Sequence, residues 1–174
     1  MNQFLKKNLT KIISVNAINR RVDEIAYDMN SRYRSKSPLV IGVLNGSFIF
    51  FADLVRALNI DIEISFIKAR SYIGKRKSGI IKFDFFNFDK IKGKDIIIVE
   101  DIIDTGSTVS EIRNKMINKA NSVAIVALLL KPKKAKVNFE IDWVGFEIPD
   151  EFVVGYGLDY DQKFRNLKGI YQGI

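Results

Sequence analysis

The chain of 174 residues contains neither cysteine nor histidine. The first absence excludes disulfide bonds and thiolate metal sites, and the second removes the commonest general base and the commonest zinc ligand. Acid–base chemistry must therefore be carried by aspartate, glutamate, lysine or tyrosine. Any metal site must be built from oxygen ligands, which is the kind of site that Mg²⁺ prefers.

Long apolar segments are also lacking. The longest one, residues 123–130, has the length of a strand and is far shorter than the ~18 residues that a membrane span requires. The first residues of the chain are too polar for a signal peptide, so we expect a cytoplasmic protein without a membrane partner. Hydrophobic residues make up 47% of the sequence and charged residues 28%, which predicts one soluble globular domain over residues 1–174.

The excess of positive charge favours anionic partners. The net charge is +8, which suits nucleic acid, a membrane surface or phosphorylated small molecules. Lysines are spread along the chain, however, and residues 131–136 are their only local concentration. No basic stripe is interleaved with aromatic residues as in many nucleic-acid-binding proteins. We therefore interpret most of the charge as solvated surface and do not expect nucleic acid as a partner.

Amphipathic helices alternate with buried strands along the chain. Helical spacing of apolar residues predicts a helix over residues 15–34, and continuous apolar runs at residues 39–44, 95–100 and 122–130 predict strands covered on both faces. Weaker patterns predict two further helices. One is capped by Ser47 and has one face made of Phe48, Phe51, Val55 and Leu58, and the other has one face made of Val109, Ile112, Met116 and Ile117. We also expect a loop at residues 69–78 and strands at residues 60–67, 80–88, 142–146 and 151–156.

This alternation predicts an α/β fold with a mainly parallel central sheet flanked by helices. Ligands bind beyond the carboxyl ends of the strands in such sheets. We therefore expect chemistry just after Leu44, Glu100 and Leu130.

The residues after the strand at 95–100 carry the most informative pattern. An acidic group precedes a hydroxyl-rich turn that opens a helix: Glu100, Asp101 and Asp104, then Thr105, Gly106, Ser107 and Thr108. Such a turn can bind phosphate through its N–H and hydroxyl groups at the positive end of the helix dipole. Three carboxylates beside it suggest sugar hydroxyls and Mg²⁺ as further ligands. A plain helix N-cap with acidic residues explains the same pattern equally well from local physics.

Residues 97–108 resemble the phosphoribosyl-pyrophosphate signature of type I phosphoribosyltransferases, and residues 99–106 resemble its hypoxanthine–guanine branch in particular. Residues 43–54 resemble the family's pyrophosphate loop and the helix after it. Ser71 and Tyr72 resemble the start of its mobile lid. Residues 145–160, with Phe164 and Arg165, resemble its purine-binding hood. These segments occur in matching order across about residues 39–167.

The resemblance implies a type I phosphoribosyltransferase fold, with a small purine-binding hood formed by roughly residues 131–174 and part of the N-terminus. It implies purine salvage, in which a phosphoribosyl group passes from phosphoribosyl pyrophosphate to N9 of hypoxanthine or guanine. The products are IMP or GMP and pyrophosphate, and Mg²⁺ assists an oxocarbenium-like transition state. The family also implies a homodimer or homotetramer.

The resemblance further implies a role for each matching residue. Asp104 would be the general base or acid at purine N7. Glu100 and Asp101 would hold the ribose hydroxyls, directly or through metal, and the 5′-phosphate would be bound by Thr105, Gly106, Ser107 and Thr108. The pyrophosphate would be bound by Asn45, Gly46 and Arg165. The purine would be bound by Lys131, Phe152, Val153 and Asp159, and Asp159 would also hold a second Mg²⁺. Lys131 would donate to the 6-oxo group, Phe152 would stack on the base and Val153 would pair with it through its backbone.

Two features of the loops follow from the same resemblance. The pyrophosphate loop predicts a non-proline cis peptide bond at Leu44–Asn45 or Asn45–Gly46. Asn45 stands where the family often has a basic residue, so backbone N–H groups would have to bind the pyrophosphate. Residues 71–79 predict a lid that is mobile without ligand.

Two other functions suit parts of the same pattern. One is a pyrimidine regulator that resembles uracil phosphoribosyltransferase and binds RNA. Lys131 and the segment Phe152–Val153 favour a purine instead. The other is a non-catalytic transcription regulator that senses phosphoribosyl pyrophosphate, and the presence of Asp104 argues against it.

Overall fold

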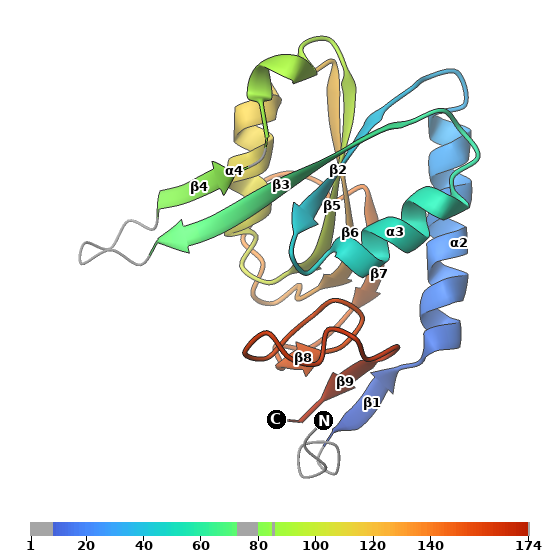
Figure 1. Ribbon diagram of the computed structural model, residues 1–174, viewed down its shortest axis with the longest axis vertical. Helices are drawn as coiled ribbons and strands as arrows, with labels where there is room; N and C mark the ends of the chain where they lie inside the picture. Colours follow the sequence, from blue (N-terminus) through green and yellow to red (C-terminus); the bar gives the residue numbers. More distant parts are fainter. Residues whose placement is uncertain (1–8, 73–79, 85, 174) are drawn as a thin grey trace.

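The computed structural model describes residues 9–72, 80–84 and 86–173, and a six-stranded sheet lies at its centre (Figure 1). The strands follow one another across the sheet in the order β4 (Ile80–Asp84), β3 (Glu63–Tyr72), β2 (Leu39–Leu44), β5 (Asp95–Ile103), β6 (Ser122–Leu130) and β7 (Trp143–Glu147). All neighbours are parallel except β3 and β4. The mainly parallel sheet predicted from the sequence is therefore confirmed.

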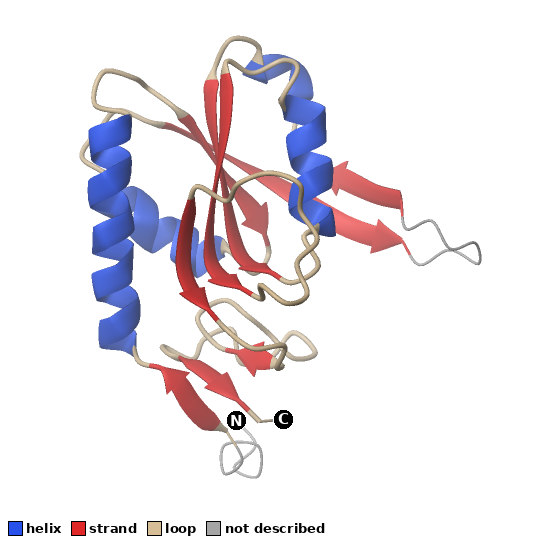
Figure 2. Cartoon of the chain, turned by 180° about the vertical axis from the view of Figure 1, so that it is seen from behind, coloured by secondary structure: helices blue, strands red, loops and turns tan. Residues whose placement is uncertain are grey.

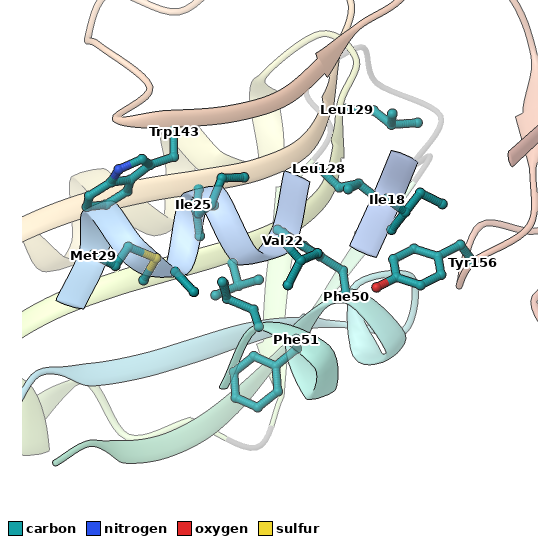
Figure 3. Close-up of a cluster of buried hydrophobic side chains, with 14 of the residues drawn as sticks. Ile18, Val22, Ile25, Met29, Phe50, Phe51, Leu128, Leu129, Trp143 and Tyr156 are labelled. Carbon is teal, nitrogen blue, oxygen red and sulfur yellow. The ribbon is translucent and has the colours of Figure 1, made fainter. Parts of the chain in front are cut away.

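Helices cover both faces of this sheet. α2 (Val15–Arg32) and α3 (Phe48–Ala57) pack on one face, and α4 (Ser107–Met116) with the short 3₁₀ helix η1 (Phe88–Ile91) packs on the other (Figures 1 and 2). Ser14 begins α2 by accepting a hydrogen bond from the N–H of Ala17. One stripe of α2 and the start of α3 meet in a core that includes Ile18, Val22, Ile25, Met29, Phe50 and Phe51 (Figure 3).

A second, three-stranded antiparallel sheet lies beyond the carboxyl ends of the central strands (Figure 2). It joins distant parts of the chain in the order β1 (Thr10–Ile13), β9 (Ile170–Gln172) and β8 (Val153–Val154). Its position places residues after β7 opposite the ends of β2, β5 and β6. Among the described residues, no helix is both long and apolar enough to cross a bilayer.

Buried strands match the sequence prediction best. β2 and β6 have the predicted bounds, because an uninterrupted apolar run is covered on both faces. β5 begins at Asp95 as predicted but continues to Ile103, because β6 goes on pairing with it beyond the acidic residues. Glu100 and Asp101 therefore lie within a strand.

Two sequence predictions near the sheet edge and in α3 are wrong. Residues 69–72 form the end of β3, where a loop was predicted, because β4 supplies an antiparallel partner for their backbone. Ser47 precedes α3, but its hydroxyl donates to the carbonyl of Val43 at 2.6 Å and does not cap the helix.

The apolar face of α3 also differs from the prediction. The helix buries Phe50, Phe51 and Leu54, whereas Phe48 is 45% exposed and Val55 is only partly buried. Most residues of this helix are apolar, so helical periodicity alone does not single out one face. The strands predicted at residues 60–67, 80–88 and 151–156 are shorter or shifted in the structure, at Glu63–Tyr72, Ile80–Asp84 and Val153–Val154.

Candidate active site

The turn between β5 and α4 encloses a small cavity of about 70 Å³, lined by Glu100 and residues 102–109. Gly106 has a φ of 83°, and a Cβ atom there would lie 2.4 Å from the side chain of Val137, so only glycine suits this position. The Thr105 hydroxyl lies 3.0 Å from that of Ser107 and accepts from its N–H at 3.3 Å. Hydroxyl and N–H groups gathered at a helix N-terminus can bind a phosphate.

Glu100 and Asp101 serve two different cavities. Glu100 lines the cavity of the turn, whereas Asp101 lines a larger cavity on the other side of β5, because successive side chains of a strand point to opposite faces. Glu100 is buried, and its Oε2 has no hydrogen-bond partner among the described residues. Burial, followed by the charge of Asp101, raises the pKa of Glu100 well above its usual value. Burial also raises the pKa of Asp101 to about 6.

These two carboxylates fit one kind of metal site. The described residues contain no group of three or more acidic side chains arranged to hold a metal ion. Mg²⁺, however, is often held by one or two carboxylates together with water and substrate phosphates. A buried carboxylate oxygen without a partner, as in Glu100, suits such an ion.

The larger cavity measures about 320 Å³ and collects residues from three parts of the chain. Asp101, Ile102 and Asp104 come from β5 and the turn after it, and Lys131 and Lys134 follow β6. The segment around β8 and the turn after it contribute Phe152, Val153, Leu158 and Asp159. The Phe152 ring is 51% exposed and meets Tyr160 edge to face, with 5.7 Å between centroids. Phe152 is therefore not a core residue, although many strand phenylalanines are.

Lys131 and Lys134 join two aspartates in a closed group of four charges, which we call the lysine–aspartate ring. The Lys131 Nζ lies 3.1 Å from a carboxylate oxygen of both Asp104 and Asp150. The Lys134 Nζ lies 3.0 Å from Asp104 and 3.2 Å from Asp150. Lys131 donates a hydrogen bond to Asp150, whereas its contact with Asp104 is an ion pair without hydrogen-bond geometry.

The ring also shifts the pKa of two of its members, Lys134 and Asp150. Hydrogen bonds to Asp104 and then to Asp150 raise the pKa of Lys134. Hydrogen bonds from Lys131 and Lys134 lower the pKa of Asp150. Both shifts favour the charged forms of these two side chains.

The loop between β2 and α3 touches the acidic strand and the segment after β8. Its Leu44–Asn45 peptide bond is cis, as predicted. A Cβ atom on Gly46 would lie 1.6 Å from Oδ2 of Asp101, and one on Gly157 would lie 2.0 Å from the carbonyl oxygen of Gly46. Side chains are excluded at both glycines, so the three segments meet through their backbones and the Asp101 carboxylate.

Arg165 stands next to the same contact. It donates to the carbonyl of Gly157 at 2.7 Å and forms an ion pair with Asp159 at 2.8 Å. The other oxygen of Asp159 accepts from the N–H of Gln162. Asp159 thus has two protein partners in the structure.

Comparison with known proteins explains this arrangement. Residues 10–161 match the model of the phosphoribosyl transferase domain. The chain is 41% identical to a hypoxanthine phosphoribosyltransferase of Haemophilus influenzae, with 93% of each chain covered. It is also 41% identical to a hypoxanthine-guanine phosphoribosyltransferase of Bacillus subtilis, with 94% of this chain and 93% of that protein covered. This chain belongs to the phosphoribosyltransferase family.

Solved structures establish the fold of this phosphoribosyltransferase as the type I fold. A Bacillus anthracis hypoxanthine-guanine phosphoribosyltransferase superposes with a TM-score of 0.88 at 37% identity, covering 96% of this chain and 99% of the other. A Staphylococcus aureus hypoxanthine phosphoribosyltransferase gives 0.91 at 33% identity, covering 100% and 96%. The fold and family predicted from the sequence are therefore confirmed.

The predicted lid falls only partly within the described residues. Ser71 and Tyr72 belong to β3, at its pairing with β4. The remaining residues of the predicted lid, 73–79, lie outside the described part of the chain, so the mobile lid stays a prediction.

Sequence reasoning missed two residues of the lysine–aspartate ring. Lys134 was noted only as part of the lysine concentration at residues 131–136, and Asp150 was not singled out. The concentration of lysines at residues 131–136 was the available signal, because it directly follows β6, where ligand contacts were expected. Nothing in the local sequence indicates that Asp150, far along the chain, faces the same lysines.

Proposed function

We propose that this phosphoribosyltransferase salvages 6-oxopurine bases in the cytoplasm. The bond between ribose C1 and the pyrophosphate oxygen breaks, and its electron pair leaves with pyrophosphate. A bond from C1 to purine N9 forms, and the purine loses one proton. Hypoxanthine would give IMP and guanine would give GMP.

Asp104 and Lys131 would act on the base. Asp104 would accept the proton from N7 as N9 bonds to C1, since the carboxylate lines the larger cavity. Lys131 would donate to the 6-oxo group, the exposed Phe152 ring would stack on the purine, and the backbone of Val153 would pair with its edge. The purine oxygen would thereby take the place of an aspartate beside Lys131.

The remaining predicted residues would hold the sugar and its phosphates. The turn after β5 would bind the 5′-phosphate through Thr105, Gly106, Ser107 and Thr108. Asn45, Gly46 and Arg165 would bind pyrophosphate, and in the loop this binding would rely on backbone N–H groups. Glu100 and Asp101 would hold the ribose hydroxyls and Mg²⁺, with Asp159 near a second ion. A Mg²⁺ ion held by these carboxylates would supply positive charge to neutralise the leaving pyrophosphate.

The observation that carries this proposal is the larger cavity itself. It brings an aspartate from the end of β5, a lysine from the end of β6 and an exposed aromatic ring from beside β8 around about 320 Å³. That volume lies at the lower end of the ~300–1,000 Å³ that small-molecule sites occupy. A flat, neutral base with one carbonyl acceptor matches these three groups.

Turnover of single bases tests the proposal. The purified chain is incubated with phosphoribosyl pyrophosphate, Mg²⁺ and hypoxanthine, guanine, xanthine, adenine or uracil, and nucleotide formation is followed by chromatography. We expect product from hypoxanthine or guanine and its loss when Mg²⁺ is chelated. Product from uracil alone, or binding of RNA or DNA in a gel shift at physiological salt without any turnover, would contradict the proposal.

We further propose that the enzyme works as a homodimer or homotetramer. Light scattering coupled to size exclusion measures the mass of the particle directly, and a mass equal to that of one chain at working concentrations would contradict the proposal.

A further inference from the structure

Tyr156 reaches from the segment after β8 into the helical layer on the opposite side of the site. Its hydroxyl donates to Oδ2 of Asp53 in α3 at 2.6 Å, across 103 positions of sequence. The ring is buried with residues of α2 and α3, including Ile18, Val22 and Phe50 (Figure 3). None of the roles described above uses this contact.

The backbone of Tyr156 is held in an unusual conformation. Its φ of 50° lies in the left-handed region, which residues other than glycine rarely adopt. Two hydrogen bonds hold the residue, one from its N–H to the carbonyl of Leu167 at 2.7 Å and one from its phenol to Asp53. A non-glycine residue kept in such a conformation often marks a functional constraint.

The neighbours of Tyr156 connect it to the pyrophosphate loop. Gly157 packs against the carbonyl of Gly46 in that loop, and Arg165 donates to Gly157. Asp53 lies in α3, the helix that begins directly after the loop. Two consecutive residues therefore contact the loop and the helix that follows it.

We infer that Tyr156 is a positioning residue that, through Asp53, fixes the pyrophosphate loop relative to the purine cavity. The inference rests on the proposed function. The purine cavity and the pyrophosphate loop lie on segments that are in contact at residues 156–157. The reaction requires C1 to lie between a bound purine and a bound pyrophosphate. The phenol–carboxylate hydrogen bond determines where α3, and with it the loop, stands.

The bond can be removed without emptying the space. Tyr156→Phe keeps the ring in the core and deletes only the hydroxyl. Asp53 keeps its contact with Arg56, so its charge is not left alone. We expect two KM values to rise about tenfold: that for pyrophosphate in the reverse reaction and that for phosphoribosyl pyrophosphate in the forward reaction. A tenfold change corresponds to the free energy that one hydrogen bond to a charged group contributes. The KM for hypoxanthine should change less than about twofold.

Tyr33→Phe is the matched control. Tyr33 is also a buried tyrosine, but it packs near Trp143 and its hydroxyl has no hydrogen-bond partner among the described residues. This variant should leave all three KM values unchanged. If Tyr156→Phe lowers the melting temperature but shifts the KM values no more than Tyr33→Phe does, the tyrosine only stabilises the fold and the inference is wrong.

Variants of the acceptor separate the hydrogen bond from packing. Asp53→Asn keeps an oxygen that can accept from the phenol, so its KM for pyrophosphate should stay near that of the wild type. Asp53→Leu should resemble Tyr156→Phe, and the double variant should add little to either. Additive effects would contradict the coupling.

Calorimetry with inorganic pyrophosphate and Mg²⁺ provides a readout that does not depend on turnover. Tyr156→Phe should bind pyrophosphate about tenfold more weakly than the wild type and Tyr33→Phe. Wild-type protein that binds pyrophosphate but converts no purine would overturn the proposed function alone. Equal binding by all three proteins would overturn the positioning role alone.

Discussion

Asp104 faces both lysines of the lysine–aspartate ring as well as the larger cavity. Lys131 and Lys134 form ion pairs with it, and its place in the cavity leaves it open to a substrate. A general base must be charged and within reach of the proton that it accepts. Asp150 contacts the same two lysines but does not line the cavity, which makes the two aspartates a natural pair for mutation.

Asp104→Asn should lower kcat by ~10²–10⁴-fold, the usual contribution of general acid–base catalysis. The KM for phosphoribosyl pyrophosphate should change little, because the amide has nearly the same volume. Asp150→Asn removes a charge from the same lysines and should cause a much smaller loss. Steady-state kinetics of both variants test this, and similar kcat values for the two would refute the assignment of Asp104.

Lys131 should account for the choice between hypoxanthine and adenine. Its ammonium group has donors only, so it can bind a 6-oxo group but opposes a 6-amino group. A site built around such a partner can reject the wrong base by ~10⁴–10⁵-fold. Lys131→Met should lose kcat/KM for hypoxanthine and narrow the gap to adenine, whereas Lys134→Met should keep the ratio. An unchanged ratio in Lys131→Met would contradict this model of recognition.

At the scale of elements, three segments of the site meet where no side chain fits. Gly46 lies against the carboxylate of Asp101, and Gly157 lies against the carbonyl of Gly46. Together with the hydrogen bonds of Tyr156 and Arg165, these contacts hold the pyrophosphate loop, β5 and the segment after β8 against one another. The close approach at the two glycines therefore limits how far these segments can move apart or together.

Gly46→Ala should abolish turnover and weaken binding of phosphoribosyl pyrophosphate. The new methyl group would lie 1.6 Å from an oxygen of Asp101, so the loop or the strand must move. Gly93→Ala is a suitable control, because a Cβ atom there meets nothing within 4 Å and only its φ of 73° is unfavourable. That control should lose about 1 kcal/mol of stability and keep its activity. Comparable turnover in both variants would argue against a steric role for Gly46.

Local patterns in the sequence predict only the parts of this site that lie within one segment, whereas Lys131, Phe152, Val153 and Asp159 were predicted through the family resemblance. Glu100, Asp101 and the turn after them occur together at the end of an apolar run, and their order alone suggests a phosphate site. Helix α3 was placed correctly, but its buried face was not, because nearly every position is apolar. The contacts of Lys134 with Asp150 and of Tyr156 with Asp53 join distant segments, and local patterns contain no information on such pairs.

At the scale of the whole molecule, the site lowers the stability of the ligand-free enzyme. Burial raises the pKa of Asp101 from 3.8 to about 6. A carboxyl group whose pKa is higher in the folded state stabilises the fold below pH 4, and that contribution disappears as the pH rises through 6. The shift corresponds to roughly 3 kcal/mol. Glu100 changes in the same direction.

Asp101→Asn should therefore become more stable relative to the wild type as the pH rises. An amide does not ionise, so it avoids the cost of a buried charge. The difference in unfolding free energy between variant and wild type should grow by up to about 3 kcal/mol from pH 4 to pH 7. Denaturant unfolding at both pH values measures it. A difference that is the same at both pH values would show that Asp101 titrates normally in the folded protein.

The contact between Gly46 and Gly157 also has a consequence for how this sequence can vary over evolutionary time. A side chain at Gly157 would meet the backbone of Gly46, and one at Gly46 would meet the carboxylate of Asp101, which is itself a residue of the proposed site. A change at either glycine therefore has no simple compensation. Asn45 is under a weaker restraint, because the proposed binding of pyrophosphate by this loop uses N–H groups that every residue except proline has. We therefore expect position 45 to accept basic, neutral or acidic residues in functional libraries, while positions 46 and 157 accept glycine alone. At this contact, the two residues without side chains are the ones that cannot be substituted.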